Sequence, residues 1–142
     1  MQVENILQSK GHTVHTVEAG APLSEALRIL NSKKIGAVVV VDAKGKVAGI
    51  LSERDIVRHL EKDPVAVLAG PVRNVMTTKV ITCTSAGSIS DLMETMTRNR
   101  IRHIPIVENG KLTGIVSIGD VVKRKIEEAE QEANALKEYI AS

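Results

Sequence analysis

Apolar residues in the first half of the chain switch between the spacing of a helix and that of a strand. Leu23, Ala26 and Leu30 recur at helical intervals behind Pro22, which predicts an amphipathic helix. A run of β-branched residues at 35–41 predicts a strand. The full prediction for this half is a helix at 3–8, strands at 13–17, 35–41 and 47–51, and a helix from 52 to about 62. We therefore expect a β-α-β-β-α unit behind a short helix.

The second half of the chain repeats the first. The segment GKVAGILSERDIVRHL at 45–60 returns as GKLTGIVSIGDVVKRK at 110–125. Upstream, the match continues with an offset that is one residue longer, because Asp42-Ala43-Lys44 is replaced by Glu108-Asn109. Each half is marginal in size for a stable fold, so the two copies are expected to pack together as one body about a pseudo-twofold axis.

The second copy predicts the same order of elements as the first. Its strands are expected at 80–84, 104–107 and 112–117, and its helices at 89–99 and from 119 onward. Pro64, Gly70 and Pro71 mark the join as a linker with a helical turn at 72–76. We expect an α/β (α+β) fold of two repeats packed through their sheets. Its parts are repeat 1 at 1–66, a linker at 67–73, repeat 2 at 74–126 and a C-terminal helical extension at 127–142.

Beyond Lys125 the sequence predicts a long charged helix with a narrow apolar seam. The seam residues follow heptad intervals of four and three: Val122, Ile126, Ala129, Ala133, Leu136 and Ile140. Its alanines favour close contact between helices, although the seam is too short for a stable free coiled coil. Two interpretations stay open, because the seam could pack on its own domain or take part in a dimer contact.

Composition disfavours several classes of partner. The formal charge is +2 and the basic residues are spread along the chain, so no broad electrostatic surface for nucleic acid is expected. The chain has no Trp or Phe and a single Tyr, Tyr139, so base-stacking platforms are absent. Any bound base would have to lie in an aliphatic slot.

Cysteine content and hydropathy bear on the compartment. The single cysteine, Cys83, cannot form an internal disulfide and fits a reducing compartment. The first residues lack the basic start and apolar run of a signal peptide, and no stretch approaches the length of a membrane span. We expect a cytoplasmic protein without a membrane partner.

Two short segments carry a family resemblance. GILSERD at 49–55 and GIVSIGD at 114–120 each follow an apolar strand and open a helix, and they resemble the signature of cystathionine-β-synthase (CBS) domains. SERDIVR at 52–58, VMT at 75–77 and RHIP at 102–105 resemble stand-alone bacterial CBS-pair proteins. The resemblance extends from about Val3 to Lys125. It implies a tandem pair, or Bateman module, that forms a homodimer through its helices.

The start of each repeated helix offers a site for a nucleotide. Free N–H groups and the positive end of the helix dipole favour phosphate beside Ser52 and Ser117. An ionised Asp55 or Asp120 can accept both hydrogen bonds of a ribose diol. Ser-x-x-Asp is also close to a helix capping box, and the local pattern alone favours that role. The resemblance favours ligand contact, with capping as a compatible second role.

The two predicted clefts differ in charge. Gly36 and Ala37 of the first copy correspond to Arg102 and His103 of the second. The resemblance implies that basic residues here face the phosphates, which makes the second cleft the better phosphate site. The alternative is that Arg102 and His103 lie on a solvated strand edge and bind no ligand. The residues that the resemblance assigns to the second cleft are Ile101, Arg102, His103, Pro105, Ser117 and Asp120, with His12, Val14 and His15 from the other repeat. Those assigned to the first cleft are Ile35, Ala37, Ser52, Arg54 and Asp55, with Thr77, Lys79 and Ile81 from the other repeat.

No catalytic or metal-binding motif accompanies these clefts, so we expect a protein that is not an enzyme. The resemblance implies a regulatory sensor that binds an adenosine ligand and modulates a separate partner. AMP is the first choice, and ADP, ATP, NAD(H) and S-adenosylmethionine share the adenosine that the motif recognises. The alternative is a scaffold or adaptor dimer that binds no ligand and acts through its helical faces.

Overall fold

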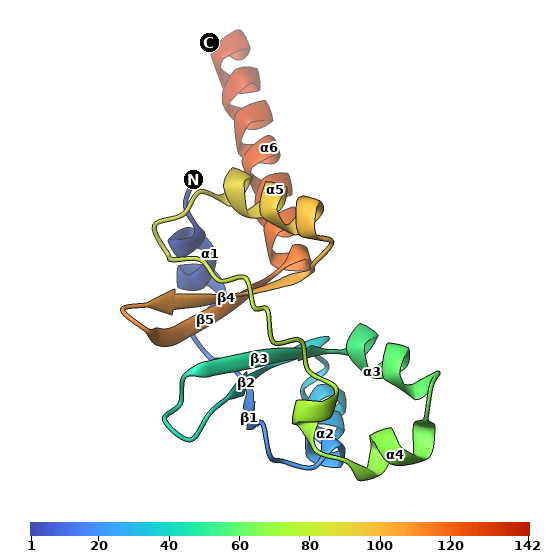
Figure 1. The fold of residues 1–142 in the computed structure, drawn as a ribbon. Helices are drawn as coiled ribbons and strands as arrows, with labels where there is room; N and C mark the ends of the chain where they lie inside the picture. The colour runs from blue at the N-terminus through green and yellow to red at the C-terminus, as the bar shows by residue number, and fades with distance from the viewer.

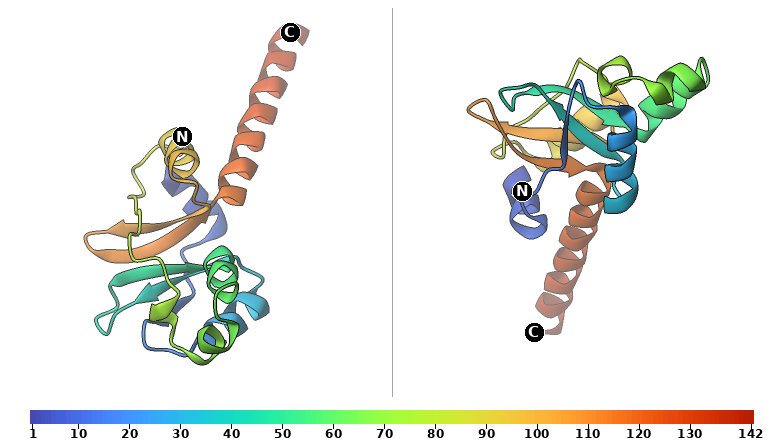
Figure 2. Two further views of the ribbon diagram at one scale, coloured as in Figure 1. Left: turned by 45° about the vertical axis from the view of Figure 1, so that its right-hand side comes forward. Right: turned by 90° about the horizontal axis from the view of Figure 1, so that it is seen from below.

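Two small sheets lie one over the other in the computed structural model, which describes residues 1–142 (Figure 1). The first repeat contributes β1 (Thr16–Glu18), α2 (Leu23–Lys33), β2 (Ala37–Val41), β3 (Val47–Ser52) and α3 (Glu53–Leu60). The second contributes α5 (Ile89–Asn99), β4 (His103–Glu108), β5 (Lys111–Ser117) and α6 (Ile118–Ala141). Helices α1 (Val3–Lys10) and α5 cover the outer side of the β4–β5 sheet, and α2 lies on the outer side of the other sheet (Figures 1 and 2).

The strands pair as the repeat predicts, with one exception. β1 runs parallel to β2, which is antiparallel to β3, whereas β4 and β5 form a two-stranded antiparallel sheet. The predicted strand at 80–84 is wrong, because Cys83 alone makes a bridge, to Ile106. In the first repeat Val39 N–H donates to His15 O, but the equivalent residue of β4 is Pro105, which has no N–H to donate. Beyond Cys83, Ser85 N–H donates to the Glu108 carboxylate instead of to β4. The ladder is therefore interrupted on either side of Cys83.

The hairpin turns explain the one-residue difference between the copies. In the first copy, Asp42 Oδ1 accepts hydrogen bonds from the N–H groups of Lys44 and Lys46, and Gly45 has φ +78°. In the second copy, Asn109 and Gly110 both have positive φ, at 50° and 77°. Asn-Gly with two positive φ angles is the tightest type of hairpin connection, so the second loop needs one residue fewer.

Each repeat has its own apolar core, and a segment from outside the repeat completes it. Val3, Ile6 and Leu7 of α1 pack in the core of the second repeat. Val72 and Val75 pack in the core of the first, from the 3-10 turn η1 (Val72–Asn74) and the residue after it. Helix α1 therefore precedes the first repeat in the sequence but packs against the second repeat in space.

The join between the repeats is more ordered than the sequence predicts. η1 confirms the expected turn near residue 72, but the prediction missed α4 (Pro64–Ala69). Asp63 Oδ1 accepts from Ala66 N–H at 3.2 Å, and Pro64 occupies the first turn, where its missing N–H costs nothing. The proline that suggested a linker therefore begins a helix.

Helix α6 leaves the body soon after it begins (Figures 1 and 2). Val121 is its one buried residue, whereas the exposed fractions of Ile126, Leu136 and Ile140 are 54%, 59% and 75%. The interpretation that the heptad seam packs on its own domain is therefore wrong. None of the helices, α6 included, is long and apolar enough to cross a bilayer.

Candidate functional site: two clefts at the starts of α3 and α6

The helices α3 and α6 begin with the same capping arrangement. Ser52 Oγ accepts from Asp55 N–H at 3.2 Å, and Asp55 Oδ2 accepts from Ser52 N–H at 2.9 Å. Ser117 and Asp120 repeat both hydrogen bonds at the same distances. These are complete capping boxes, so the capping role of both Ser-x-x-Asp motifs is confirmed.

In the first cleft the carboxylate is buried and fully engaged. Asp55 is 6% exposed, and its Oδ2 accepts from both the N–H and the Oγ–H of Ser52. Its Oδ1 accepts from Thr77 Oγ1 at 3.0 Å, and Arg58 lies 3.9 Å away. The residue predicted to come from the other repeat, Thr77, is therefore present, but it occupies the oxygen that a ligand would need.

In the second cleft the equivalent carboxylate is more accessible and faces a cation. The Asp120 side chain is 24% exposed, and Lys10 Nζ donates to its Oδ2 at 2.7 Å and to Ile115 O at 2.9 Å. Oδ1 has no protein donor. Burial alone would raise the pKa of Asp120, but hydrogen bonds from Lys10 and Ser117 hold this pKa below its usual value. The second cleft therefore presents an ionised acceptor with one free oxygen.

His103 lies where the two repeats meet. A Cβ at Gly36 would lie 3.3 Å from His103 Cε1 and 3.9 Å from Glu53 Oε1, so the imidazole from β4 rests against the first repeat. Burial lowers the pKa of His103, and the positive charge of Lys10 lowers it further. Glycine at position 36 thus leaves room for the histidine side chain of the second cleft.

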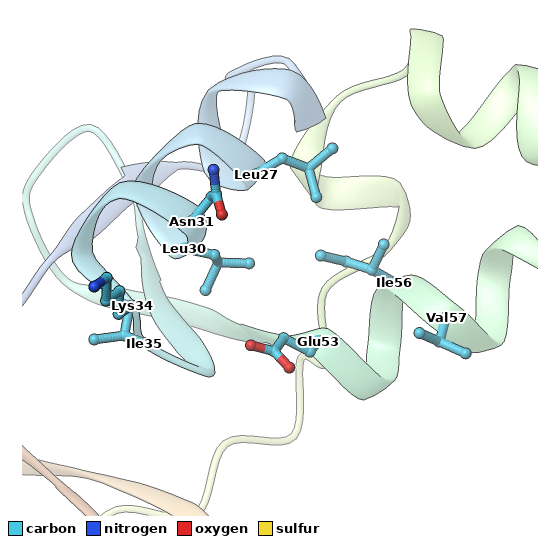
Figure 3. A pocket seen from close by; sticks show the side chains of 8 residues that line it. All are labelled: Leu27, Leu30, Asn31, Lys34, Ile35, Glu53, Ile56 and Val57. Atoms are coloured by element: carbon cyan, nitrogen blue, oxygen red, sulfur yellow. The ribbon is translucent and has the colours of Figure 1, made fainter.

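Two cavities of related position lie beside the starts of α3 and α6. The first, of about 580 Å³, lies between α2 and α3, where the Leu27 and Leu30 side chains point toward Ile56 (Figure 3). Its lining residues are Leu27, Leu30, Asn31, Lys34, Ile35, Glu53, Ile56 and Val57. The second, of about 320 Å³, is lined by Arg54, Met96, Thr97, Arg100, Ile101, Arg102 and Ile118. Arg54, which the prediction placed in the first cleft, therefore shares a cavity with Ile101 and Arg102 of the second.

The other predicted residues lie at varied distances from the two caps. His12 Nδ1 is 2.9 Å from Thr113 O on β5, next to the second cleft. Ala37 pairs with Ser52, and the buried Pro105 pairs with Ile115. His15 O accepts from Val39 N–H at the edge of the first sheet. Val14 and Ile81 are half-buried and Lys79 is exposed, and none of the three makes a side-chain hydrogen bond in either cleft.

The sequence prediction missed three residues of this region: Lys10, Glu53 and Arg100. Lys10 ends α1 and reaches across to α6, so no local motif marks it. Arg100 ends α5 with φ 53°, and Lys34 ends α2 with φ 54° at the equivalent place. The alignment of the two repeats, which sets Arg100 opposite Lys34, is the sequence signal that could have indicated Arg100. No three His, Cys, Asp or Glu side chains converge as a metal site would require.

Two interlocked α+β repeats, each with a polar cleft at a helix start, define a tandem module with paired candidate ligand sites. The family model described as CBS domain matches this chain twice, at residues 6–62 and 72–127. The chain belongs to the CBS domain family. Proteins of this family are generally regulatory rather than catalytic.

Solved structures share both fold and sequence with the chain. The CBS-domain containing protein ATU1752 from Agrobacterium tumefaciens is 45% identical with a TM-score of 0.84, over 87% of this chain and 92% of that one. The CBS domain pair of protein MJ0100, in complex with 5'-methylthioadenosine and S-adenosyl-L-methionine, is 25% identical with a TM-score of 0.77 over 87% of this chain and 98% of that one. Some structural relatives thus bind adenosine-containing ligands.

Relatives among curated proteins are longer than this chain. An uncharacterized 17.7 kDa protein of Acidianus ambivalens is 35% identical over 78% of the chain, and the mitochondrial CBS domain-containing protein CBSX3 of Arabidopsis thaliana is 36% identical over 82%. The matched region covers 66% of the first relative and 58% of the second. The chain therefore spans less than two thirds of the length of either protein.

Proposed function

We propose that this protein is a regulatory module that binds an adenosine-containing ligand in its second cleft and modulates a separate partner protein. The observation that carries the proposal is the Asp120 carboxylate, which stays ionised, partly exposed and free at one oxygen beside a helix start. An ionised carboxylate is an acceptor for the two hydroxyls of a ribose. The adenosine ligands of MJ0100 lend support to this ligand class.

The surroundings of Asp120 suit a ligand that carries phosphate. Arg102 and Arg54 line the neighbouring cavity, and His103 stands between the repeats. A guanidinium makes strong charge-assisted hydrogen bonds to phosphate, and the first turn of α6 adds the positive end of its dipole. AMP is our first choice, with ADP, ATP, NAD(H) and S-adenosylmethionine as alternatives. In this proposal Ser117, Ile101 and Pro105 frame the ligand, with His12, Val14 and His15 on the facing side.

The first cleft is the weaker candidate. Its residues Ser52, Asp55 and Thr77 satisfy one another, so a ligand would have to displace the Thr77 hydroxyl before reaching the carboxylate. Leaving that half-buried donor without a partner has a cost of about 1 kcal/mol. One occupied cleft per chain is therefore the expected stoichiometry.

The proposal includes a homodimer and a role without catalysis, and it places the protein in the cytoplasm. Exposed apolar residues on α3 and α6, Val57 at 66% and Val122 at 46%, favour contact between copies. The second candidate function is a scaffold or adaptor dimer that binds no nucleotide and acts through these faces. The exposed seam of α6 is the observation in its favour.

Thermal unfolding in the presence of a panel of adenosine ligands distinguishes the regulatory module from the scaffold. A ligand that binds only the folded state stabilises it by about 2.7 kcal/mol at a hundred times its Kd. Asp120→Ala should abolish the shift. Asp91→Ala is the control, because Asp91 follows the N-cap Ser88 of α5 at the same spacing as Asp120 follows Ser117, and it lies outside both clefts. A shift that survives Asp120→Ala would reject the site, and no shift with any ligand would favour the scaffold.

A further inference from the structure

The projecting part of α6 carries an apolar stripe that nothing in the chain covers. All six residues of the heptad seam, Val122, Ile126, Ala129, Ala133, Leu136 and Ile140, are exposed. The helix stands clear of the body over its last turns (Figures 1 and 2). An isolated exposed helix of this kind is marginally stable, so its apolar stripe needs a partner surface.

The charged residues that flank the stripe identify a partner. With Ile126, Ala133 and Ile140 at the a positions and Val122, Ala129 and Leu136 at d, the g positions hold Lys125, Glu132 and Tyr139. The e positions hold Lys123, Glu130 and Lys137. The e and g positions decide the choice and orientation of partners in a two-stranded coil.

A parallel, in-register pair of α6 helices satisfies these charges. Each g residue then faces the following e residue of the other helix, so Lys125 meets the partner's Glu130 and Glu132 meets the partner's Lys137. Both kinds of contact are attractive, and the twofold axis makes each occur twice.

An antiparallel pair with the same apolar layers sets like charges together. There e faces e and g faces g, so Glu130 meets the partner's Glu130 and Glu132 meets the partner's Glu132. Lys123 would also face the partner's Lys137. The charge pattern therefore favours the parallel arrangement over the antiparallel one.

We propose that the exposed stripe of α6 binds the α6 of a second copy of this chain in a parallel, in-register pair. The inference builds on the proposed homodimer and assigns it a contact outside the two repeats. Because Val121 anchors the start of α6 in the core of the second repeat, the pair joins the two second repeats rather than a first to a second. Two of the six apolar layers are alanine, so the contact is weak and supplements contacts between the bodies.

Glu132 and Lys137 form the cleanest pair to test. Both are exposed and neither has an ion-pair partner within the chain, whereas Lys125 Nζ already lies 3.7 Å from Glu128 Oε2 and 3.3 Å from Ser90 Oγ. Glu132→Lys and Lys137→Glu should each weaken dimerisation about tenfold, since each turns two attractive contacts into repulsive ones. The double variant should restore the wild-type dissociation constant, as measured by analytical ultracentrifugation. A dissociation constant that is unchanged in both single variants would overturn the inference while leaving the proposed homodimer in place.

Cross-linking tests whether the two α6 helices run parallel or antiparallel. Leu136→Cys should form a disulfide-linked dimer under mild oxidation, because a parallel pair sets residue 136 against itself. An antiparallel pair instead sets 126 against 136, so a cross-link found only on mixing Ile126→Cys with Leu136→Cys would overturn the inference. Burial raises the pKa of the native Cys83 to about 11, which keeps this thiol unreactive, and the unmodified chain is the control. The nucleotide-dependent thermal shift should persist in every α6 variant, so failure here is distinguishable from failure of the proposed function.

Discussion

Lys10 Nζ lies 2.7 Å from Asp120 Oδ2, so the last residue of α1 is paired with the capping carboxylate of α6. The same ammonium donates to Ile115 O at the end of β5. Two segments far apart in the sequence are thereby joined at the candidate ribose site. Any ligand that donates hydrogen bonds to Asp120 competes with Lys10 for the carboxylate.

The pair should contribute modestly to stability. Both side chains are partly exposed, at 33% and 24%, so solvent screens their attraction, and Lys10→Met should lower the free energy of unfolding by about 1 kcal/mol. Urea unfolding measures this loss, and Lys33→Met is the control, because Lys33 occupies the last turn of α2 without an ion pair. A double-mutant cycle with Asp120→Asn should give a coupling energy of the same size. Strict additivity of the two variants would contradict it.

Lys10→Met should also tighten the binding of adenosine. The variant frees Oδ2 of Asp120, and a competing contact of about 1 kcal/mol corresponds to an affinity gain of about fivefold. The gain should be smaller for AMP, because the variant also removes a positive charge near the phosphate. Calorimetric titration of both ligands measures the two changes, and weaker adenosine binding would show that Lys10 supports the site.

His103 should make stability depend on pH. Its pKa in the folded state lies below the ordinary 6.5, so the unfolded chain binds more protons in that interval. The free energy of unfolding should therefore rise with pH through this window and fall as the solution becomes more acid than about 6.5. Urea unfolding at about pH 5 and about pH 7.5 measures the change. His103→Asn should reduce the difference, and an unchanged pH profile in this variant would reject the assignment.

Asp55 and Asp120 should differ in their cost to stability. Asp55→Ala removes a buried carboxylate and leaves the half-buried Thr77 hydroxyl and Ser52 N–H without their acceptor, so a loss of about 2 to 3 kcal/mol is expected. In Asp120→Ala the donors of the lost hydrogen bonds, Lys10 Nζ and Ser117 N–H, can turn to water, so the free energy of unfolding should fall by about 1 kcal/mol. Chemical denaturation compares the two, and equal losses would show that the buried hydrogen bonds of Asp55 add nothing beyond a cap.

Equivalent glycines of the two hairpins should respond differently to alanine. A Cβ at Gly49 would lie 2.9 Å from the backbone oxygen of Thr77, whereas a Cβ at Gly114 would meet the movable end of Leu7 at 2.7 Å. Gly49→Ala should therefore cost about 2 to 3 kcal/mol and Gly114→Ala about 1 kcal/mol. Thermal unfolding of the two variants tests the order, and the reverse order would show that the backbone at Thr77 yields more easily than Leu7.

The sequence predicted what depends on local pattern and missed what depends on distant contacts. The hairpins and both Ser-x-x-Asp helix starts were predicted correctly, because alternating apolar residues and capping motifs act within a few residues. Lys10 was missed since its partner Asp120 is 110 positions away. The strand predicted at 80–84 was wrong because Pro105 has no N–H to donate to it, and because the Glu108 carboxylate accepts from Ser85 N–H just beyond it.

The exposed state of the α6 seam also lay outside the reach of the sequence. A heptad pattern marks a face that needs burial, but it does not say which surface covers it. The structure removed one interpretation by showing Leu136 and Ile140 far from the core. Ligand identity stays a prediction, since the adenosine ligands under comparison share the groups that Asp120 would bind.

The placement of α1 in the core of the second repeat has a consequence for biosynthesis. Val3, Ile6 and Leu7 are made well before their neighbours Ile104 and Val116, because the whole first repeat lies between them in the sequence. Until Ile104 and Val116 are made, the apolar residues of α1 have no core to join and stay open to chaperones or to other nascent chains. Val72 and Val75, by contrast, follow directly on the core that they complete. The core of the first repeat can thus form once Val75 has been made, while the core of the second repeat cannot form until the β4–β5 hairpin has been made.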